Sequence, residues 1–133
     1  MDNLIKIKIN TEHDIVTARQ TGREMAKEFG FPLLDLALIA TAISELTRNI
    51  ISYAQEGSIT IETFHENNKR GIVVISKDKG PGIENIDLAM QAGYSTTNSL
   101  GLGLPGVKRL MDDFEIKSEL GKGTTITIKK WMN

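Results

Sequence analysis

Apolar residues recur at every second position in several short stretches of this 133-residue chain, and these stretches predict its strands. Isoleucines alternate with lysines over residues 5–9, which is typical of an edge strand with one buried face. Two β-rich stretches, 58–64 and 72–77, flank a polar turn and predict an antiparallel hairpin. A further alternating stretch, 124–130, predicts the last strand.

Apolar residues at three- and four-residue steps predict the two longest helices. The first helix, over 12–29, begins at a capping-box pattern of Thr11 with Asp14 and ends at Gly30, a residue type that readily terminates helices. The second, over 35–54, is the predicted central helix because one stripe along it is apolar throughout. That stripe consists of Leu36, Ile39, Ile43, Leu46 and Ile50.

The last third of the chain predicts shorter elements. Residues 85–91 fit a short helix, and 93–104 carry glycine and serine with no apolar period, which indicates a loop. Pro105 suits the first turn of a further helix. The inward-facing residues of that helix are expected to be Val107, Leu110, Met111 and Phe114. This order predicts one domain over 1–133, an α/β two-layer sandwich whose mixed sheet is covered on one face by helices.

Composition narrows the classes of function. The formal net charge is -1 and acidic and basic residues are interspersed, so the broad basic surface that nucleic-acid or anionic-membrane binding normally requires is missing from the sequence. The chain has no cysteine, which removes disulfides, thiolate nucleophiles and cysteine-based zinc sites. We expect neither a signal peptide nor a membrane-spanning segment, and therefore a cytoplasmic protein.

The first candidate for chemistry lies on the predicted central helix. Glu45 and Asn49 stand one helical turn apart, at the edge of the apolar stripe. A carboxylate there can orient or deprotonate a nucleophile, and an amide oxygen can ligate Mg²⁺ that phosphates already hold. Two solvated polar residues would give the same pattern.

The second candidate follows the second strand of the predicted hairpin. Asp78 stands at the strand end, and Gly80 and Gly82 follow it within a tight turn. A carboxylate in this place can accept a hydrogen bond from the exocyclic amine of adenine. An Asx turn that merely leaves the strand is the alternative.

Two glycine-rich motifs complete the candidates. The stretch 101–106 precedes a helix, whose free amides can receive phosphate oxygens. Its spacing matches neither the dinucleotide fingerprint nor a P-loop, and a flexible linker is the alternative. The stretch 121–125 enters the last strand, where a simple glycine turn would suffice.

Taken in this order, the four motifs resemble the four boxes of the Bergerat ATP-binding fold. The superfamily includes gyrase, the Hsp-ninety chaperones, histidine kinases, MutL and the anti-sigma-factor kinases, and the resemblance covers about residues 35–130. It implies ATP and Mg²⁺ as ligands, with Asn49 ligating the metal and Asp78 accepting from adenine with support from Thr124. Glu45 would be the general base or a positioning carboxylate. The remaining implied nucleotide contacts are Gly80, Gly82, Gly101, Leu102, Gly103 and Leu104, with the amides of 103–106 at the helix start.

Within the superfamily, the stretch 93–112 closely resembles the RsbT-type switch kinases, and the motif at 45–50 and the ending Lys130-Trp131 point the same way. A histidine kinase would need a phospho-accepting histidine on an upstream helix, whereas His13 and His65 are expected at the surface. Gyrase, MutL and the Hsp-ninety chaperones carry a longer lid and further domains.

This resemblance implies a serine/threonine-protein kinase of a stressosome-type stress pathway. Such a kinase phosphorylates STAS-domain antagonist and scaffold proteins and, once released, activates a serine phosphatase. Two alternatives stay open. One is an anti-sigma-factor kinase of the SpoIIAB or RsbW type, which binds a sigma factor. The other is a nucleotide-binding regulatory adaptor without a catalytic role.

Overall fold

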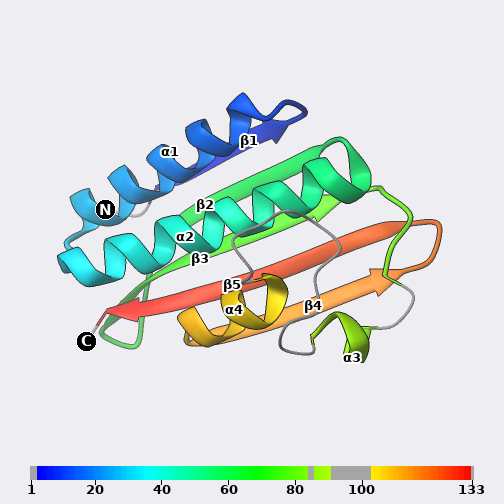
Figure 1. Cartoon of the computed structure of the whole chain (residues 1–133). Helices are drawn as coiled ribbons and strands as arrows, with labels where there is room; N and C mark the ends of the chain where they lie inside the picture. The colour runs from blue at the N-terminus through cyan, green and yellow to red at the C-terminus, as the bar shows by residue number, and fades with distance from the viewer. Residues whose placement is uncertain (1–2, 84–85, 91–102, 133) are drawn as a thin grey trace.

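The structure, a computed structural model, describes residues 3–83, 86–90 and 103–132. Helices α1, α2 and α4 lie together on one face of a five-stranded sheet (Figure 1). In chain order the elements are β1 (Leu4–Ile9), α1 (His13–Phe29), α2 (Leu33–Asn49), a π-helical segment η1 (Ile50–Ala54), β2 (Gly57–Glu66), β3 (Lys69–Asp78), α3 (Ile86–Ala89), α4 (Gly103–Leu110), β4 (Asp113–Glu119) and β5 (Gly123–Met132). The predicted two-layer α/β sandwich is confirmed.

The sheet has the strand order β1-β2-β3-β5-β4, and every neighbouring pair is antiparallel. The expectation of a mixed sheet was therefore wrong in this respect. Strands β3 and β4 run in the same direction, but β5 lies between them and is antiparallel to both. A direct hairpin joins β4 to β5, so the chain never needs the long crossover that two adjacent parallel strands require.

Strand β4 is an element that the sequence analysis missed. The helix predicted from Pro105 ends at Leu110, and Phe114 lies on β4 rather than on that helix. The Asp112 carboxylate accepts a hydrogen bond of 2.7 Å from the backbone N–H of Trp131 and so holds the start of β4 beside β5. The alternation of Phe114 and Ile116 with charged residues was the available signal.

The predicted first helix is confirmed, but its capping box is only half made. The Asp14 carboxylate accepts hydrogen bonds of 2.9 Å from the backbone N–H groups of Asn10 and Thr11. These donors, Asn10 first, hold the pKa of Asp14 below its ordinary value. The Thr11 hydroxyl also turns toward this carboxylate, at 3.2 Å, instead of capping the helix. Gly30 ends the helix with φ 107°, in the left-handed region that glycine adopts without strain.

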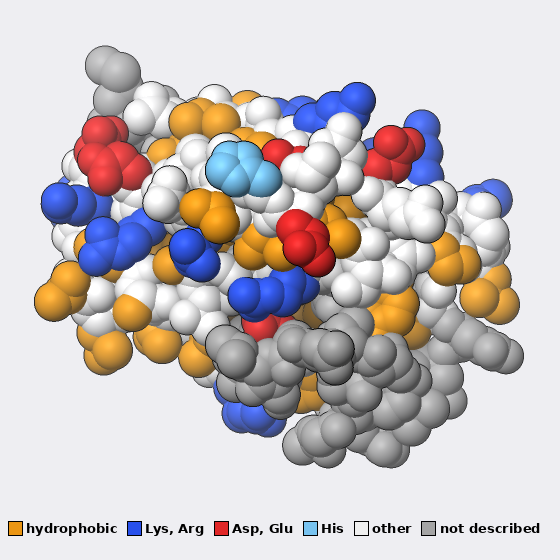
Figure 2. Space-filling view, turned by 45° about the horizontal axis from the view of Figure 1, so that its top comes forward, with side chains coloured by type: hydrophobic (Ala, Val, Ile, Leu, Met, Phe, Trp, Pro, Cys, Tyr) orange, Lys and Arg blue, Asp and Glu red, His pale blue; other side chains and the backbone are white. Residues whose placement is uncertain are grey.

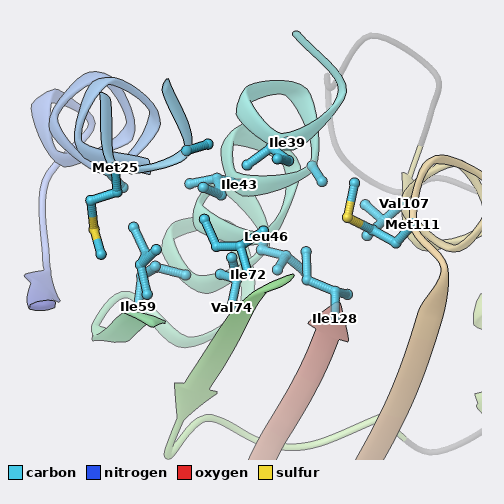
Figure 3. Packing of buried hydrophobic residues seen from close by; sticks show 14 of the residues in the cluster. Met25, Ile39, Ile43, Leu46, Ile59, Ile72, Val74, Val107, Met111 and Ile128 are labelled. Atoms are coloured by element: carbon cyan, nitrogen blue, oxygen red, sulfur yellow. The ribbon is translucent and has the colours of Figure 1, made fainter. Parts of the chain in front are cut away.

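The core lies between the helices and the inner face of the sheet. All five residues of the predicted stripe on the central helix are buried. Figure 3 shows Leu46 of α2 pointing toward Ile72 and Val74 of the sheet. Ile43 faces α1, where its Cδ1 fills the space beside Gly22. Val107 of α4 closes the same core from the other side of α2. Helix α2 thus packs against α1, the sheet and α4, which makes it the central element that carries the site.

The helix-bearing side of the molecule shows acidic and basic side chains interspersed over its surface (Figure 2). In the view of Figure 2, no broad basic surface interrupts this mixture. Among the described residues, no helix combines the length and apolar character needed to span a membrane.

Candidate functional site

The predicted motifs that the structure describes gather at one end of the sheet, where β3 ends and β5 begins. The turn at Gly80 packs on the end of η1, since a Cβ on this glycine would lie 2.6 Å from the Cβ of Ala54. Gly123 passes so close to Asp78 that a Cβ there would overlap the Asp78 carbonyl oxygen. The η1 segment that follows α2, the turn after β3 and the start of β5 therefore meet in one place.

Asp78 and Thr124 stand directly opposite each other in the register of β3 and β5. The Asp78 Oδ1 atom accepts a 2.9 Å hydrogen bond from the backbone N–H of Gly80, which is the Asx turn that the sequence left open as an alternative. No other described residue donates a hydrogen bond to this carboxylate. The second oxygen of Asp78 is therefore available to a ligand, and the turn and a binding role are compatible.

Ser118 is a residue of this site that the sequence analysis missed. It lies on β4 opposite Thr124, and its Oγ lies 2.8 Å from the Thr124 Oγ1. The same Oγ accepts a 2.7 Å hydrogen bond from the backbone N–H of Ile83 and lies 3.2 Å from the carbonyl oxygen of Gly123. Without strand β4 in the prediction, nothing placed this serine beside the last strand.

Glu45 lies inside the core, not at its edge as expected. Its side chain is 2% exposed, and Oε1 lies 3.2 Å from Nη1 of Arg48, whose side chain is 32% exposed. Helix α4 packs against α2, and the buried residues of α2 extend beyond the predicted stripe. The ion pair connects the buried carboxylate to the surface through Arg48.

Asn49 occupies the last position of α2, directly before the π-helical segment. Its side chain is half-buried and forms no hydrogen bond with any other described residue. Short π-helical segments widen a helix and occur frequently at functional sites. A half-buried amide with its donors and acceptor unused suits a ligand-binding role.

The predicted lid falls partly outside the described residues. Gly101 and Leu102 lie in that part, and Gly103 opens α4 with φ 55°. The Leu104 side chain belongs to the core, so only its backbone could contact a nucleotide. The expectation that residues 103–106 all supply amides was wrong, because Pro105 has no N–H.

A cavity of about 440 Å³ opens at the same end of the sheet. Its lining consists of Lys77, Asp78, Lys79, Lys117, Ser118, Glu119, Lys122, Gly123, Thr124 and Thr125. Lys77, Lys117 and Thr125 alternate along their strands with inward-facing residues, so the cavity opens on the face of the sheet that the helices leave uncovered. Asp78 and Thr124, the residues predicted to contact adenine, also contribute to this lining.

The side chains at this end of the sheet limit how a divalent metal could be ligated. Among the described residues, no three His, Cys, Asp or Glu side chains gather around a common point. Of the predicted site residues, Asn49 could offer a neutral amide oxygen to a metal that phosphates hold. This pattern fits Mg²⁺, which is usually bound through few protein groups together with substrate phosphates.

Comparison with known proteins decides the family. The sequence pattern of the histidine kinase-like ATPase domain matches residues 9–130. The chain belongs to this family. It is 53% identical to the serine/threonine-protein kinase RsbT of Bacillus subtilis, over 95% of each chain. It is 33% identical to an anti-sigma F factor of Clostridium kluyveri, over 99% of this chain and 96% of that protein.

Solved structures of low sequence identity share the fold of this family member. The RsbU and RsbW domains of a Mycobacterium tuberculosis protein superpose with a TM-score of 0.67 at 22% identity, over 96% of this chain and 32% of that one. The mycobacterial sensor histidine kinase MprB superposes with a TM-score of 0.57 at 14% identity. The predicted resemblance to RsbT-type kinases, and with it the expectation of a protein serine/threonine kinase, is confirmed by these comparisons.

Proposed function

We propose that this chain is the ATP- and Mg²⁺-dependent kinase of a cytoplasmic, stressosome-type partner-switching pathway. Its substrates are a serine or threonine of STAS-domain antagonist and scaffold proteins, and its second partner is a serine phosphatase that it activates after release. The observation that carries the proposal is the 53% identity to RsbT over 95% of both chains. The site geometry supports it, because the adenine-side and metal-side candidates meet at one end of the molecule.

Each candidate residue has a role that its surroundings allow. The free oxygen of Asp78 accepts from the adenine amine, while the Asx turn to Gly80 holds the carboxylate in place. The unused side-chain amide of Asn49 offers an oxygen to the metal. The backbone at Gly82, Gly103 and Leu104 approaches the nucleotide. Bound Mg-ATP would supply the phosphoryl group, and its metal would neutralise phosphate charge.

Glu45 is proposed to act on the hydroxyl of the protein substrate. Its carboxylate is buried and paired with Arg48, so its position is well defined. A fixed carboxylate can accept or orient the proton of an incoming hydroxyl group, which lowers the barrier to transfer. Phosphoryl transfer depends mainly on positioning and charge stabilisation, and a preorganised pair of this kind supplies both.

The test is direct phosphorylation. The purified chain is incubated with radiolabelled ATP, Mg²⁺ and candidate STAS-domain proteins, and the labelled residue is mapped by mass spectrometry. We expect label on a serine or threonine of a STAS domain. Label that appears on no STAS-domain protein, in the presence of demonstrated ATP binding, would contradict the proposed substrate class.

The 33% identity to anti-sigma F factors favours one second candidate, an anti-sigma-factor kinase. It differs from the first in its partner, since it would hold a sigma factor. A pull-down with sigma factors and with a serine phosphatase, both offered at equal concentration, separates the two. Retention of the phosphatase supports the RsbT-like function, and tight retention of a sigma factor supports the alternative.

A further inference from the structure

We propose that Ser118 is a positioning residue of the nucleotide site, which orients the Thr124 hydroxyl and thereby strengthens the preference for adenine over guanine. The inference rests on the proposed ATP site and adds a residue to it. Ser118 comes from β4, Thr124 from β5, and the Ile83 N–H from the turn after β3. One hydroxyl group thus connects the three segments that surround the adenine-side candidates.

The chemistry of its three neighbours decides which group is the donor in each hydrogen bond of the Ser118 hydroxyl. The N–H of Ile83 can only donate, and it lies 2.7 Å from the Ser118 Oγ. The carbonyl oxygen of Gly123 can only accept, and it lies 3.2 Å from the same atom. A serine hydroxyl has one hydrogen and two lone pairs. If Ser118 donates to Gly123, one lone pair serves Ile83 and the second remains for the hydrogen of Thr124, 2.8 Å away.

The reverse assignment satisfies fewer groups. If Ser118 donated its hydrogen to Thr124, its contact with the Gly123 carbonyl would be lost. Buried and half-buried polar groups in folded proteins are nearly always paired, and Thr124 is 9% exposed. The first assignment uses all three contacts. In it the Thr124 hydroxyl points its hydrogen at Ser118 and keeps its lone pairs for a ligand.

A hydroxyl that presents lone pairs discriminates between purine bases. The exocyclic amine of adenine donates hydrogen bonds, whereas guanine carries a carbonyl oxygen at the same ring position and can only accept there. Thr124 in this orientation therefore attracts adenine and repels guanine, in the same sense as the Asp78 carboxylate beside it. Removing the Ser118 hydroxyl frees Thr124 to rotate and to donate to guanine, while Asp78 still favours adenine.

The experiment measures nucleotide binding without any protein partner. Affinities for Mg-ATP and Mg-GTP are determined by competition against a fluorescent ATP analogue, for the wild type, Ser118→Ala and Ser118→Thr. We expect Ser118→Ala to weaken ATP binding about three- to tenfold, the size of one lost hydrogen bond. GTP binding should stay equal or improve, so that the ATP-to-GTP ratio falls, and Ser118→Thr should restore it.

Thr125→Val is the matched control, because this neighbour of Thr124 faces the opposite side of the sheet and forms no hydrogen bond with its side chain among the described residues. An unchanged ratio of ATP affinity to GTP affinity in Ser118→Ala would overturn the inference. If both affinities fell equally, the role of Ser118 would be merely structural. If Ser118→Ala does not fold, Ser118→Thr decides: wild-type selectivity supports the inference and lost selectivity overturns it.

The two proposals fail separately in this design. A chain that binds ATP with Ser118-dependent selectivity but phosphorylates no STAS-domain protein refutes the proposed function and leaves this inference standing. A chain that phosphorylates such a protein, but whose selectivity does not change in Ser118→Ala, refutes only this inference.

Discussion

At the scale of single residues, the two polar positions on the central helix differ more than their spacing suggests. Glu45 is buried and paired with Arg48, while Asn49 is half-buried and forms no side-chain hydrogen bond with the described residues. The Glu45 carboxylate is therefore part of the packed core as well as a candidate for the site, whereas the Asn49 amide is a candidate for the site alone. We therefore expect substitution of Glu45 to affect both stability and activity, and substitution of Asn49 to affect activity alone.

Asn49→Ala should abolish most activity and leave the fold intact. The substitution removes no hydrogen bond among the described residues, so the free energy of unfolding without nucleotide should change by less than about 1 kcal/mol. Loss of the metal ligand should lower phosphorylation by about a hundredfold or more. Thermal melts and radiolabel transfer check this, with the exposed Asn10→Ala as control. Wild-type turnover in Asn49→Ala would exclude the metal role.

Glu45→Gln should keep ATP binding and lose transfer. Glutamine has the same shape but cannot take up the proton of the substrate hydroxyl, and help of that kind is typically worth about 10²–10⁴-fold in rate. Single-turnover transfer at saturating ATP measures the effect. Arg48→Met is the companion variant, because it removes the ion pair and retains the carboxylate. If only Arg48→Met slows transfer, Glu45 is a structural residue.

At the scale of elements, the site depends on how closely the turn between β4 and β5 approaches the end of β3. Gly121 and Gly123 both have positive φ, at 78° and 123°. They differ in their surroundings. A Cβ on Gly121 would meet nothing within 4 Å, whereas one on Gly123 would overlap the backbone of Asp78.

Gly123→Ala and Gly121→Ala form a matched pair for this contact. Both variants should lose about 1–2 kcal/mol of stability from left-handed backbone strain alone. Gly123→Ala should lose more, because β5 must move away from Asp78, and its ATP affinity should fall while that of Gly121→Ala stays close to wild type. Urea unfolding and ATP titration measure the two effects. Equal ATP affinity in both variants would show that the approach of Gly123 to Asp78 does not contribute to nucleotide binding.

The start of α1 should respond to pH through Asp14. Its lowered pKa means that the ionised carboxylate stabilises the folded chain above the ordinary aspartate pKa of about 3.9, and that this contribution is lost as the pH falls through the lowered value. Asp14→Asn should therefore melt below wild type at pH 7, and the gap should close below about pH 4. Asp35→Asn, in the first turn of α2, is the control. A gap that is constant with pH would contradict the assignment.

At the scale of the whole molecule, the proposed function requires catalysis and partner exchange on one small chain. The helix side and one end of the sheet carry the nucleotide candidates, and none of the described helices covers the opposite sheet face. A partner that docks on a surface separate from the nucleotide should still bind when ATP binding is weakened. A variant with weakened ATP binding can therefore distinguish a kinase, whose output needs ATP, from a regulatory adaptor, whose output does not.

Asp78→Asn tests that separation. The amide can turn its NH₂ group toward the adenine amine and lacks the charge, and a hydrogen bond to a charged group is worth about 1.5–3 kcal/mol. ATP affinity should therefore fall roughly ten- to a hundredfold or more, and phosphorylation should collapse at low ATP. The variant should still bind its STAS-domain antagonist in a pull-down and leave the phosphatase unstimulated in cells. Normal phosphatase activation with an unphosphorylated antagonist would favour the adaptor.

The layer architecture and most of the motifs could be predicted from local sequence patterns. The apolar stripe of α2 is continuous and long, so its period identifies the element and its buried face whatever surrounds it. The glycines at Gly30 and Gly82 adopt positive φ, which local turn chemistry predicts. The spacing of Glu45 with Asn49 and the strand end at Asp78 are equally local. These features depend on residues that are neighbours in the chain.

Other features of the fold and the site depend on contacts between residues that are far apart in the chain, and local patterns could not predict them. Strand β4 pairs with β5 along its whole length, and the hydrogen bond between Asp112 and Trp131 holds its start. This pairing makes a short alternating stretch into a strand. It also places Ser118 opposite Thr124. Glu45 is buried, although its spacing on the helix placed it at the edge of the apolar stripe. The sheet is antiparallel throughout because β5 lies between β3 and β4. Periodicity describes one segment at a time, whereas strand pairing and burial depend on which segments come together in space.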